Sequence, residues 1–208
     1  MGGTMIEYPK INSVYKRTKG GRFILDQFSQ PEFEYLKWNN WVGTEKIEGM
    51  NIRVIWEQGE LYFKGRTDRA ILPQHLIGKL SELFNKEQMV KTFGKEDVCI
   101  YGEGFGKGIQ NGMKYIPDGV NFSMFDIKIG DYWLRRDDML DISLDLGICI
   151  VSEMFKGSLY EAIDRVRNGI NSNWGYFLAE GLVLKPEFEL RDRWGNRVMA
   201  KIKTKDFK

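Results

Sequence analysis

The sequence contains only two cysteines and one histidine in 208 residues, and this scarcity excludes several kinds of site. Cys99 and Cys149 lie far apart within apolar runs, which predicts two buried thiols and no disulfide framework or cysteine metal site. A single histidine excludes a zinc site built from several histidines. His75 follows Pro73 at the start of a helical pattern, where a surface or capping role is favoured over catalysis.

Long hydrophobic runs and a strong charge imbalance are also absent. No apolar stretch approaches the roughly twenty residues that a membrane-spanning helix needs. The first residues, Met1-Gly2-Gly3-Thr4, lack the pattern of a signal peptide. We therefore expect a cytoplasmic protein, or one of the host cytoplasm if it is viral, with no membrane partner. The net charge of +2 argues against a surface that is basic throughout, but it is compatible with a local basic groove.

Hydrophobic residues make up 42% of the chain and charged residues 29%, which is typical of a globular protein with a sizeable core. Residues 51–57 alternate in polarity, and the turn at 58–60 followed by 61–64 predicts an antiparallel hairpin. Further strands are expected over residues 97–101, 121–129, 182–185 and 197–203. Helices are expected over residues 76–93 and 137–146, and from a capping box at Ser158 to Val166. The pattern predicts an α+β fold of antiparallel β-sheets flanked by helices.

The segment Glu45-Lys46-Ile47-Glu48-Gly49-Met50-Asn51 places one lysine between acidic residues at a turn between two strands. A lysine amine attacks phosphorus only when it is neutral, whereas its ordinary pKa of about 10.4 keeps it charged in water. Cationic neighbours or a bound metal lower the pKa of such an amine and make it a nucleophile. Taken alone, this heptapeptide is more often a solvated surface turn.

Four further segments carry charged or glycine-rich sequence where a half-buried strand would not. They are Lys64 to Thr67, Tyr101 to Gln110, Glu180 to Lys185 and Lys201 to Lys203. Each has a structural alternative. The glycines from Gly104 to Gly108 could cradle phosphate, but no helix beginning Gly-Lys-Ser/Thr follows, which disfavours a Walker loop. Lys201 and Lys203 share one strand face, which also suits a solvated edge strand.

Taken together and in order, these segments resemble the nucleotidyltransferase motifs of the covalent ATP-dependent ligases, a superfamily shared with the mRNA capping enzymes. The likeness is to an ATP-dependent RNA ligase of the type that seals nicks in duplex RNA. It runs from about residue 6 to the end and includes the opening Tyr8-Pro9-Lys10-Ile11. The stretches that resemble motifs I, III, IIIa, IV and V are Lys46 to Asn51, Gly102 to Gln110, Phe122 to Ile127, Glu180 to Lys185, and Lys201 to Lys203.

The resemblance implies the ATP-grasp-like adenylation fold of these ligases, with two departures. Glu48 stands where many members have Asp, so its contacts are expected to shift. The chain also ends shortly after Lys203, where DNA ligases and capping enzymes append an oligonucleotide-binding fold and duplex-RNA ligases append a small helical domain. We therefore expect one minimal nucleotidyltransferase domain over residues 1–208 without a C-terminal accessory domain, either natural or cut from a longer protein.

The resemblance also implies a reaction in three steps, in which ATP adenylates the enzyme, AMP passes to a 5′-phosphate, and a 3′-hydroxyl attacks and releases AMP. Lys46 would be the nucleophile that becomes bonded to AMP, with Lys201 and Lys203 as catalytic cations. Glu180 would hold Mg²⁺, or Mn²⁺, through water. The nucleotide would be bound by Glu45 and Phe125 at the adenine, by Asn51 and Arg66 at the ribose or α-phosphate, by Glu103 at a ribose hydroxyl, by Lys185 at phosphate, and by Ile47 beside the nucleophile.

The expected partner is RNA with 5′-phosphate and 3′-hydroxyl ends, in nicked duplex form, acted on by a monomer. A DNA ligase core is an alternative, which Asn51 and the pattern at 106–110 disfavour. A GTP-using capping domain is more distant. A catalytically silent nucleic-acid-binding module is the alternative from another class. It is disfavoured because Lys46, Glu103, Glu180 and Lys203 are all present.

Overall fold

The computed structural model describes residues 7–207, so the expectation for Met1 to Thr4 lies outside the described residues. Contacts divide the chain into two compact units. Unit 1 contains residues 7–9 and 48–151, and unit 2 contains residues 10–47 and 152–207. Each unit is built from two separate stretches of chain. The sequence has no linker of distinctive composition at the boundaries between these stretches, and for this reason the sequence pattern alone predicts one domain.

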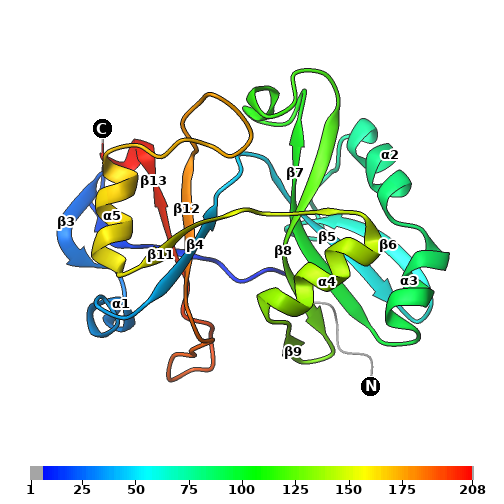
Figure 1. Ribbon diagram of the computed structural model, residues 1–208, viewed down its shortest axis with the longest axis horizontal. Coiled ribbons are helices and arrows are strands. Elements are labelled where there is room, and N and C mark those ends of the chain that lie inside the picture. Colours follow the sequence, from blue (N-terminus) through cyan, green and yellow to red (C-terminus); the bar gives the residue numbers. More distant parts are fainter. Residues whose placement is uncertain (1–6, 208) are drawn as a thin grey trace. The chain divides into compact units, whose positions relative to one another are not determined.

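Unit 1 is built on a six-stranded sheet with the order β10-β8-β7-β5-β6, in which β9 also pairs with β8 (Figure 1). Its strands are β5 (Met50–Glu57), β6 (Glu60–Gly65), β7 (Val98–Gly106), β8 (Val120–Ile129), β9 (Tyr132–Trp133) and β10 (Cys149–Ile150). All of these pairs are antiparallel except β10 with β8. The hairpin predicted over residues 51–64 is confirmed, with Glu57 opposite Glu60.

Three helices cover the apolar face of this sheet (Figure 1). They are α2 (Gln74–Leu83), α3 (Lys86–Phe93) and α4 (Arg136–Leu146). Alternate residues of β5, β7 and β8, including Val54, Ile100 and Met124, pack against these helices in one cluster of buried side chains. The opposite face therefore carries the other half of each strand, and it is the face on which the polar residues lie.

Unit 2 contains a five-stranded sheet with the order β1-β13-β12-β4-β11 and a separate hairpin of β2 and β3. Its strands are β1 (Asn12–Ser13), β2 (Tyr15–Arg17), β3 (Phe23–Phe28), β4 (Trp41–Glu45), β11 (Glu153–Gly157), β12 (Gly181–Pro186) and β13 (Ala200–Lys203). Helix α1 (Pro31–Tyr35) and helix α5 (Leu159–Arg167) belong to the same unit. The core forms where α5 packs on Trp41, Leu182, Leu184 and Ile202.

The sequence predictions for the helices are mostly confirmed. Helix α4 matches the predicted 137–146 closely, and α5 begins with the predicted capping box between Ser158 and Glu161. The single helix predicted over 76–93 is wrong, because Phe84 is extended and the side chain of Asn85 caps a new helix by accepting from Gln88 N–H. Among residues 7–207, no helix has the length and apolar character needed to cross a membrane.

Two further expectations need correction. The strand predicted over 197–203 is shorter, since only Ala200–Lys203 pairs as a strand. Cys149 is exposed, not buried, while Cys99 is buried as predicted, and both thiols are free. Burial raises the pKa of the Cys99 thiol to about 12, so this thiol is inert at neutral pH. His75 lies exposed in α2, with Nε2 3.1 Å from the Lys107 carbonyl oxygen.

Candidate functional site

Lys46 lies directly after β4 and before β5, so the predicted turn between two strands is confirmed. β4 pairs antiparallel with β12, and Glu45 is opposite Leu182. The pairing extends one step further, because the Lys46 backbone N–H donates to the Gly181 carbonyl oxygen at 3.0 Å. The backbone of Lys46 is therefore held at the end of a sheet, next to the residue that follows Glu180.

Glu180 joins two of the predicted lysines. The Lys46 Nζ lies 2.6 Å from Glu180 Oε2, and the Lys203 Nζ lies 2.6 Å from Glu180 Oε1. The Glu180 side chain is only 8% exposed, and the two lysine side chains are 22% and 23% exposed. One nearly buried carboxylate thus contacts two ammonium groups, one on each of its oxygens, through charge-assisted hydrogen bonds.

Gly181 allows Glu180 to reach this position. Its φ of +154° lies in a region that residues with side chains rarely adopt, and a Cβ atom there would lie 1.9 Å from the Ile202 carbonyl oxygen. The backbone of β12 therefore approaches β13 more closely than any other residue would permit. On the other side, Thr204 N–H donates to the Glu180 carbonyl oxygen at 2.8 Å. Glu180 is fixed by its backbone on both sides.

The remaining predicted lysines of unit 2 share the sheet face of Lys203. Leu182, Leu184, Ala200 and Ile202 point into the core, so the alternate residues of β12 and β13 point the opposite way. Lys185 and Lys201 are among these and are half-buried. Lys201 lies opposite Val183, and Lys185 opposite Val42. Lys185, Lys201 and Lys203 therefore place three positive charges on one face of this sheet.

Glu45 points to the other side of β4. Its side chain is buried, and its carboxylate accepts the Ser172 hydroxyl at 2.6 Å and the Asn173 N–H at 3.0 Å. Both carboxylate oxygens are therefore engaged by the loop that precedes β12. Ile47 is buried as well. The contacts of Glu45 anchor the strand that carries Lys46, and its role toward adenine stays a prediction.

Unit 1 carries a separate row of polar residues across three strands. Asn51 lies opposite Glu103, and Glu103 lies opposite Ser123, so all three share one sheet face. Asn51 Oδ1 and Ser123 Oγ are buried without a hydrogen-bond partner among residues 7–207. A buried polar atom left unpaired costs about 1–3 kcal/mol, so this row suits a ligand that supplies hydroxyl or amino groups. Sequence reasoning missed Ser123, although it shares the segment of Phe125.

Phe125 owes its position to an irregularity in β8. Tyr101 is opposite Asp126 and Gly102 is opposite Met124, so Phe125 is the extra residue of a bulge. The ring of Tyr8 lies 4.9 Å from the Phe125 ring at 72°, and the Tyr8 hydroxyl donates to Asp126 Oδ2 at 2.6 Å. Tyr8 therefore supports Phe125 and caps the buried Asp126, a role that its place in the sequence did not predict.

Arg66 follows β6 and is exposed, without an ion pair among the described residues. The neighbouring Asp68 is occupied by Arg53 Nη2 at 2.7 Å and by Lys64 at 3.3 Å. These two cations lower the pKa of the Asp68 carboxyl, so it stays ionised. Because Asp68 is taken, the Arg66 guanidinium is available for an anionic ligand.

The predicted residues thus fall into two sets, and the structure brings together the members of each set within its own unit. Unit 1 holds the predicted residues Asn51, Arg66, Glu103 and Phe125. Unit 2 holds Glu45, Lys46, Ile47, Glu180, Lys185, Lys201 and Lys203. The boundary between the units falls between Ile47 and Glu48, inside the segment that carries the lysine.

Glu48, the first residue of unit 1 after this boundary, is clamped by a short 3₁₀ segment (Gly112–Lys114) and its neighbours. Asn111 Nδ2 donates to Glu48 Oε1 at 2.6 Å, and Lys114 Nζ lies 3.0 Å from Oε2. The Glu48 backbone N–H donates to the Tyr115 hydroxyl at 3.1 Å. The adjoining Gly49 has no room for a Cβ, which would lie 2.3 Å from the Gly104 carbonyl oxygen. The segment after Lys46 is therefore held firmly on unit 1.

We expect Glu48 and Lys114 to be energetically coupled, because their side chains are only 18% and 29% exposed. In a double-mutant cycle of Glu48→Gln and Lys114→Met, measured by urea unfolding, the coupling should be about 1 kcal/mol. The pair Glu60 and Lys86, 2.6 Å apart but 54% and 59% exposed, is the control, and its cycle should give less than about 0.5 kcal/mol. Equal coupling in the two cycles would contradict the clamp.

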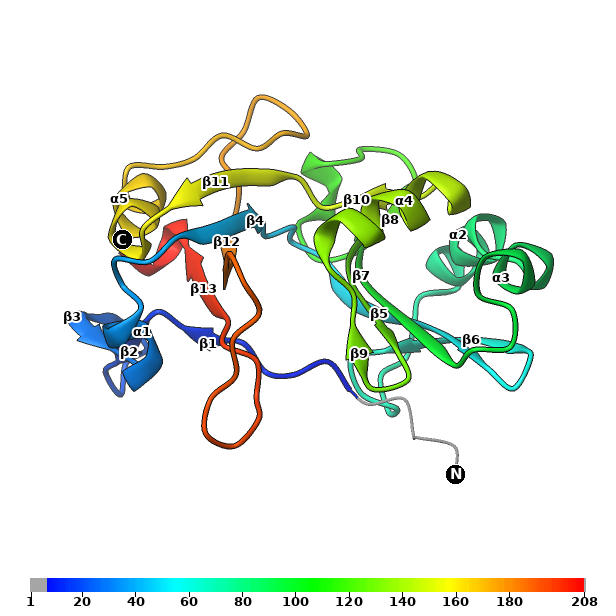
Figure 2. The same ribbon diagram turned by 60° about the horizontal axis from the view of Figure 1, so that its bottom comes forward.

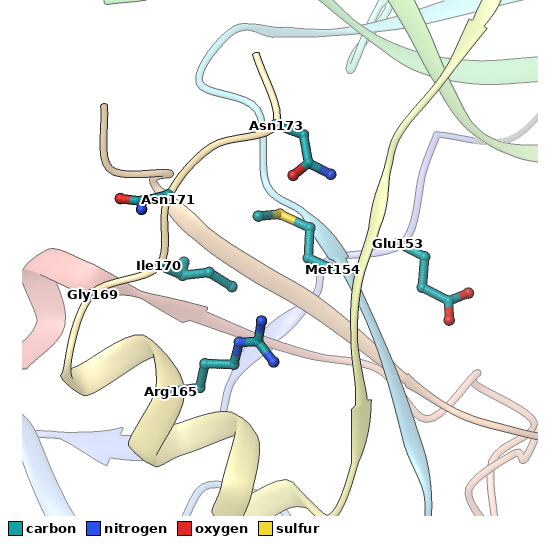
Figure 3. Close-up of a pocket in the computed structure, with 7 residues that line it drawn as sticks. All are labelled: Glu153, Met154, Arg165, Gly169, Ile170, Asn171 and Asn173. Atoms are coloured by element: carbon teal, nitrogen blue, oxygen red, sulfur yellow. The ribbon is translucent and has the colours of Figure 1, made fainter. Parts of the chain in front are cut away.

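A pocket of about 500 Å³ in unit 2 lies elsewhere (Figure 3). It is lined by Glu153, Met154, Arg165, Gly169, Ile170, Asn171 and Asn173. It contains none of the sequence-predicted residues, although the N–H of its lining residue Asn173 donates to Glu45. A pocket without a lysine beside a carboxylate offers no nucleophile, so the chemistry is assigned to the cluster at Glu180.

A metal site made of protein ligands alone is not present in the described part of the chain, where no group of three or more His, Cys, Asp or Glu side chains could hold an ion. Glu180 fits a different kind of site. Mg²⁺ keeps several waters and is held in nucleotide-processing enzymes by one or two carboxylates together with substrate phosphates. A single carboxylate among phosphate-binding cations matches this donor set.

A family model described as RNA ligase matches residues 39–203 of the chain. This range includes every predicted site residue. Comparison with curated protein sequences gives no match.

Solved structures of Naegleria gruberi RNA ligase resemble the chain. A mutant with ATP and Mn has a TM-score of 0.70 at 16% identity, over 97% of this chain and 57% of that one. A mutant with AMP and Mn has a TM-score of 0.66 at 16% identity, over 100% and 60%. An apo mutant has a TM-score of 0.68 at 18% identity, over 99% and 58%. At these identities the likeness shows a shared fold, and the chain spans less than two thirds of those relatives.

Proposed function

The chain belongs to the RNA ligase family, and on this premise we propose that it is an ATP-dependent RNA ligase acting through a lysyl-AMP intermediate. The observation that carries this proposal is the contact of Lys46 and Lys203 with the two oxygens of Glu180. A lysine nucleophile needs a group that takes its proton and a cation that stabilises the charge of the phosphate it attacks. The Glu180 carboxylate lies 2.6 Å from Lys46 Nζ and could take its proton, and the Lys203 ammonium lies 2.6 Å from the other oxygen of the same carboxylate.

In the first step the Lys46 amine attacks the α-phosphorus of ATP. A nitrogen–phosphorus bond forms, the bond from the α-phosphorus to the bridging oxygen breaks, and pyrophosphate leaves. The Lys46 ammonium must first lose a proton, and Glu180 Oε2 is the acceptor that it already contacts. Lys203 contacts the other oxygen, Oε1, and would stabilise the negative charge that builds up on the phosphate oxygens. Lys201 and Lys185 add to the positive field of this sheet face.

A divalent cation fits beside Glu180, which would hold it through water. When bound, Mg²⁺ or Mn²⁺ would neutralise negative charge on the phosphate oxygens. The solved Naegleria gruberi structures named with ATP and Mn, and with AMP and Mn, support the choice of nucleotide and metal.

The nucleoside would be bound by unit 1. The buried acceptor Asn51 Oδ1 and the hydroxyl of Ser123 would satisfy their missing hydrogen bonds on ribose hydroxyls, beside Glu103. Phe125, supported from one side by the Tyr8 ring, would stack on adenine with its other side. Arg66 would bind phosphate as a planar guanidinium. The substrate of the later steps would be RNA with 5′-phosphate and 3′-hydroxyl ends in a nicked duplex, acted on by a monomer.

The proposal is tested by incubating the protein with ATP labelled at the α-phosphate and with Mg²⁺ or Mn²⁺. We expect one equivalent of label to become bonded to the protein in an acid-stable form, and mass spectrometry of peptides to place AMP on Lys46. Labelled GTP is the control and should give no product. Adding nicked RNA, DNA and hybrid duplexes should then release the label fastest with RNA. A folded protein that takes no label would instead support a silent nucleic-acid-binding module.

A further inference from the structure

The connection between β12 and β13 forms a finger, which we define as residues 187–199. Its two arms are tied by the Val198 N–H to Leu190 oxygen bond at 2.8 Å and by a bridge between Arg191 and Arg197. Figure 2 shows this connection, drawn in orange and red, extending as a long loop beyond the strands of the unit 2 sheet. The finger contributes little to the core of unit 2: Val198 is its one member in the core cluster, and Met199 beside it is also buried.

The tip of the finger is organised by the carboxylate of Asp192. Asp192 Oδ1 accepts the N–H groups of Trp194 at 2.9 Å and Asn196 at 2.8 Å, and Oδ2 accepts the Asn196 side-chain amide at 3.0 Å. Asn196 is the largest cause of a lowered pKa at Asp192, so the carboxylate stays ionised. Gly195 adopts the positive φ of +83° that closes the turn. These contacts use only the backbone of Trp194.

The Trp194 indole is therefore presented to solvent. It is 67% exposed, and the guanidinium carbon of Arg193 lies 3.9 Å from the centre of its ring. Phe188, at the base of the finger, is 76% exposed. Because the Trp194 indole is not buried, its apolar surface adds little hydrophobic stabilisation to the fold.

The charges of the finger leave one cation for a ligand. Arg191 lies 2.8 Å and Arg197 3.0 Å from Glu189, so both arginines are held within the finger by the same carboxylate. Asp192 is engaged in the turn. Arg193 has no ion pair among the described residues and stacks on Trp194 instead. An arginine stacked on an exposed indole offers both a flat surface for a base and a charge for phosphate.

We propose that this finger binds the RNA strand that is to be joined, with a base stacked at Trp194 and a backbone phosphate at Arg193. The inference rests on the proposed function, because RNA is the substrate expected of this family. Stacking and phosphate contact are sequence-tolerant, which suits a ligase that seals ends of any sequence.

The test compares Trp194→Ala and Arg193→Gln with the wild-type protein in two assays. Fluorescence anisotropy measures binding of a labelled nicked RNA duplex, and α-labelled ATP measures lysyl-AMP formation. We expect each variant to bind the duplex about tenfold more weakly, with a steeper loss when both are combined and with lysyl-AMP formation unchanged. Tyr35→Ala, which removes a ring that is 84% exposed in α1, is the matched control and should leave both unchanged.

An RNA affinity of Trp194→Ala equal to that of the wild-type protein, with the fold intact by circular dichroism, would overturn the inference. The same holds if Tyr35→Ala weakens binding as much. Failure of the wild-type protein to form lysyl-AMP would overturn the proposed function alone, since duplex binding is measured without ATP. The two proposals are therefore tested separately.

Discussion

Replacing Lys46 with alanine is expected to abolish transfer of AMP from ATP to the protein, with a loss of about 10⁴-fold or more. In the proposed reaction Lys203, on the other oxygen of Glu180, stabilises charge on the phosphate and does not replace Lys46 as the nucleophile. The loss should appear as absence of protein-bound label after incubation with α-labelled ATP and Mn²⁺, and as absence of sealed nicked RNA.

Lys46→Arg separates the chemical role of this residue from its charge. A guanidinium keeps the ion pair with Glu180, but it stays protonated and cannot act as the nucleophile. We expect Lys46→Arg to unfold in urea close to the wild-type midpoint and to take no label. Lys91→Ala, an exposed lysine in α3, controls for loss of a lysine in general and should label normally. Residual labelling of Lys46→Arg would remove Lys46 from the role of nucleophile.

Replacing Gly181 with alanine should give the largest loss of stability of any single methyl group added in unit 2. The new Cβ would lie 1.9 Å from the Ile202 carbonyl oxygen, on a backbone with φ of +154°. Overpacking and backbone strain together predict a loss of about 3 kcal/mol in the free energy of unfolding. Urea unfolding measures this directly.

Gly21→Ala is the control for the strain of a positive φ alone. Gly21 has φ of +83°, and nothing lies within 4 Å of the position of its missing Cβ. It should lose only about 1–2 kcal/mol, the cost of the left-handed backbone. If the two alanine variants were equally stable, β12 and β13 could separate without cost, and the fixed position of Glu180 would lose its explanation.

The local structure around Lys46 follows from the sequence because short-range patterns determine it. Alternation in residues 51–57 gives β5, and the turn at Gly59 gives its hairpin with β6. The contact of Lys46 with Glu180 does not follow from any such pattern, since the two residues are far apart in the chain. Only the resemblance to known ligases predicted that they act together, through the order of short motifs.

The wrong predictions have local physical causes. Helical periodicity continues through Phe84, but Asn85 offers its side chain to a new N-terminus and ends the first helix. Val198 alternates correctly for a strand, yet its N–H bonds to Leu190 inside the finger. Cys149 follows an apolar pattern, but β10 is an edge strand and exposes it. The bulge at Phe125 and the units themselves depend on contacts between distant segments, which periodicity does not encode.

Residues 48–151 are an insertion within the chain of unit 2. The strands β4 and β11 flank this insertion and are paired in the sheet of unit 2. Beside this pair, the Glu45 N–H donates to the Ser152 carbonyl oxygen at 2.9 Å. Because the two ends of unit 2 at the insertion lie side by side, a short glycine linker could join them directly in place of residues 48–151 without distorting the sheet of unit 2. Such a deletion would retain the Lys46, Glu180 and Lys203 cluster and remove the strands proposed to bind the nucleoside. The proposed phosphate chemistry could then be tested apart from the proposed recognition of the base.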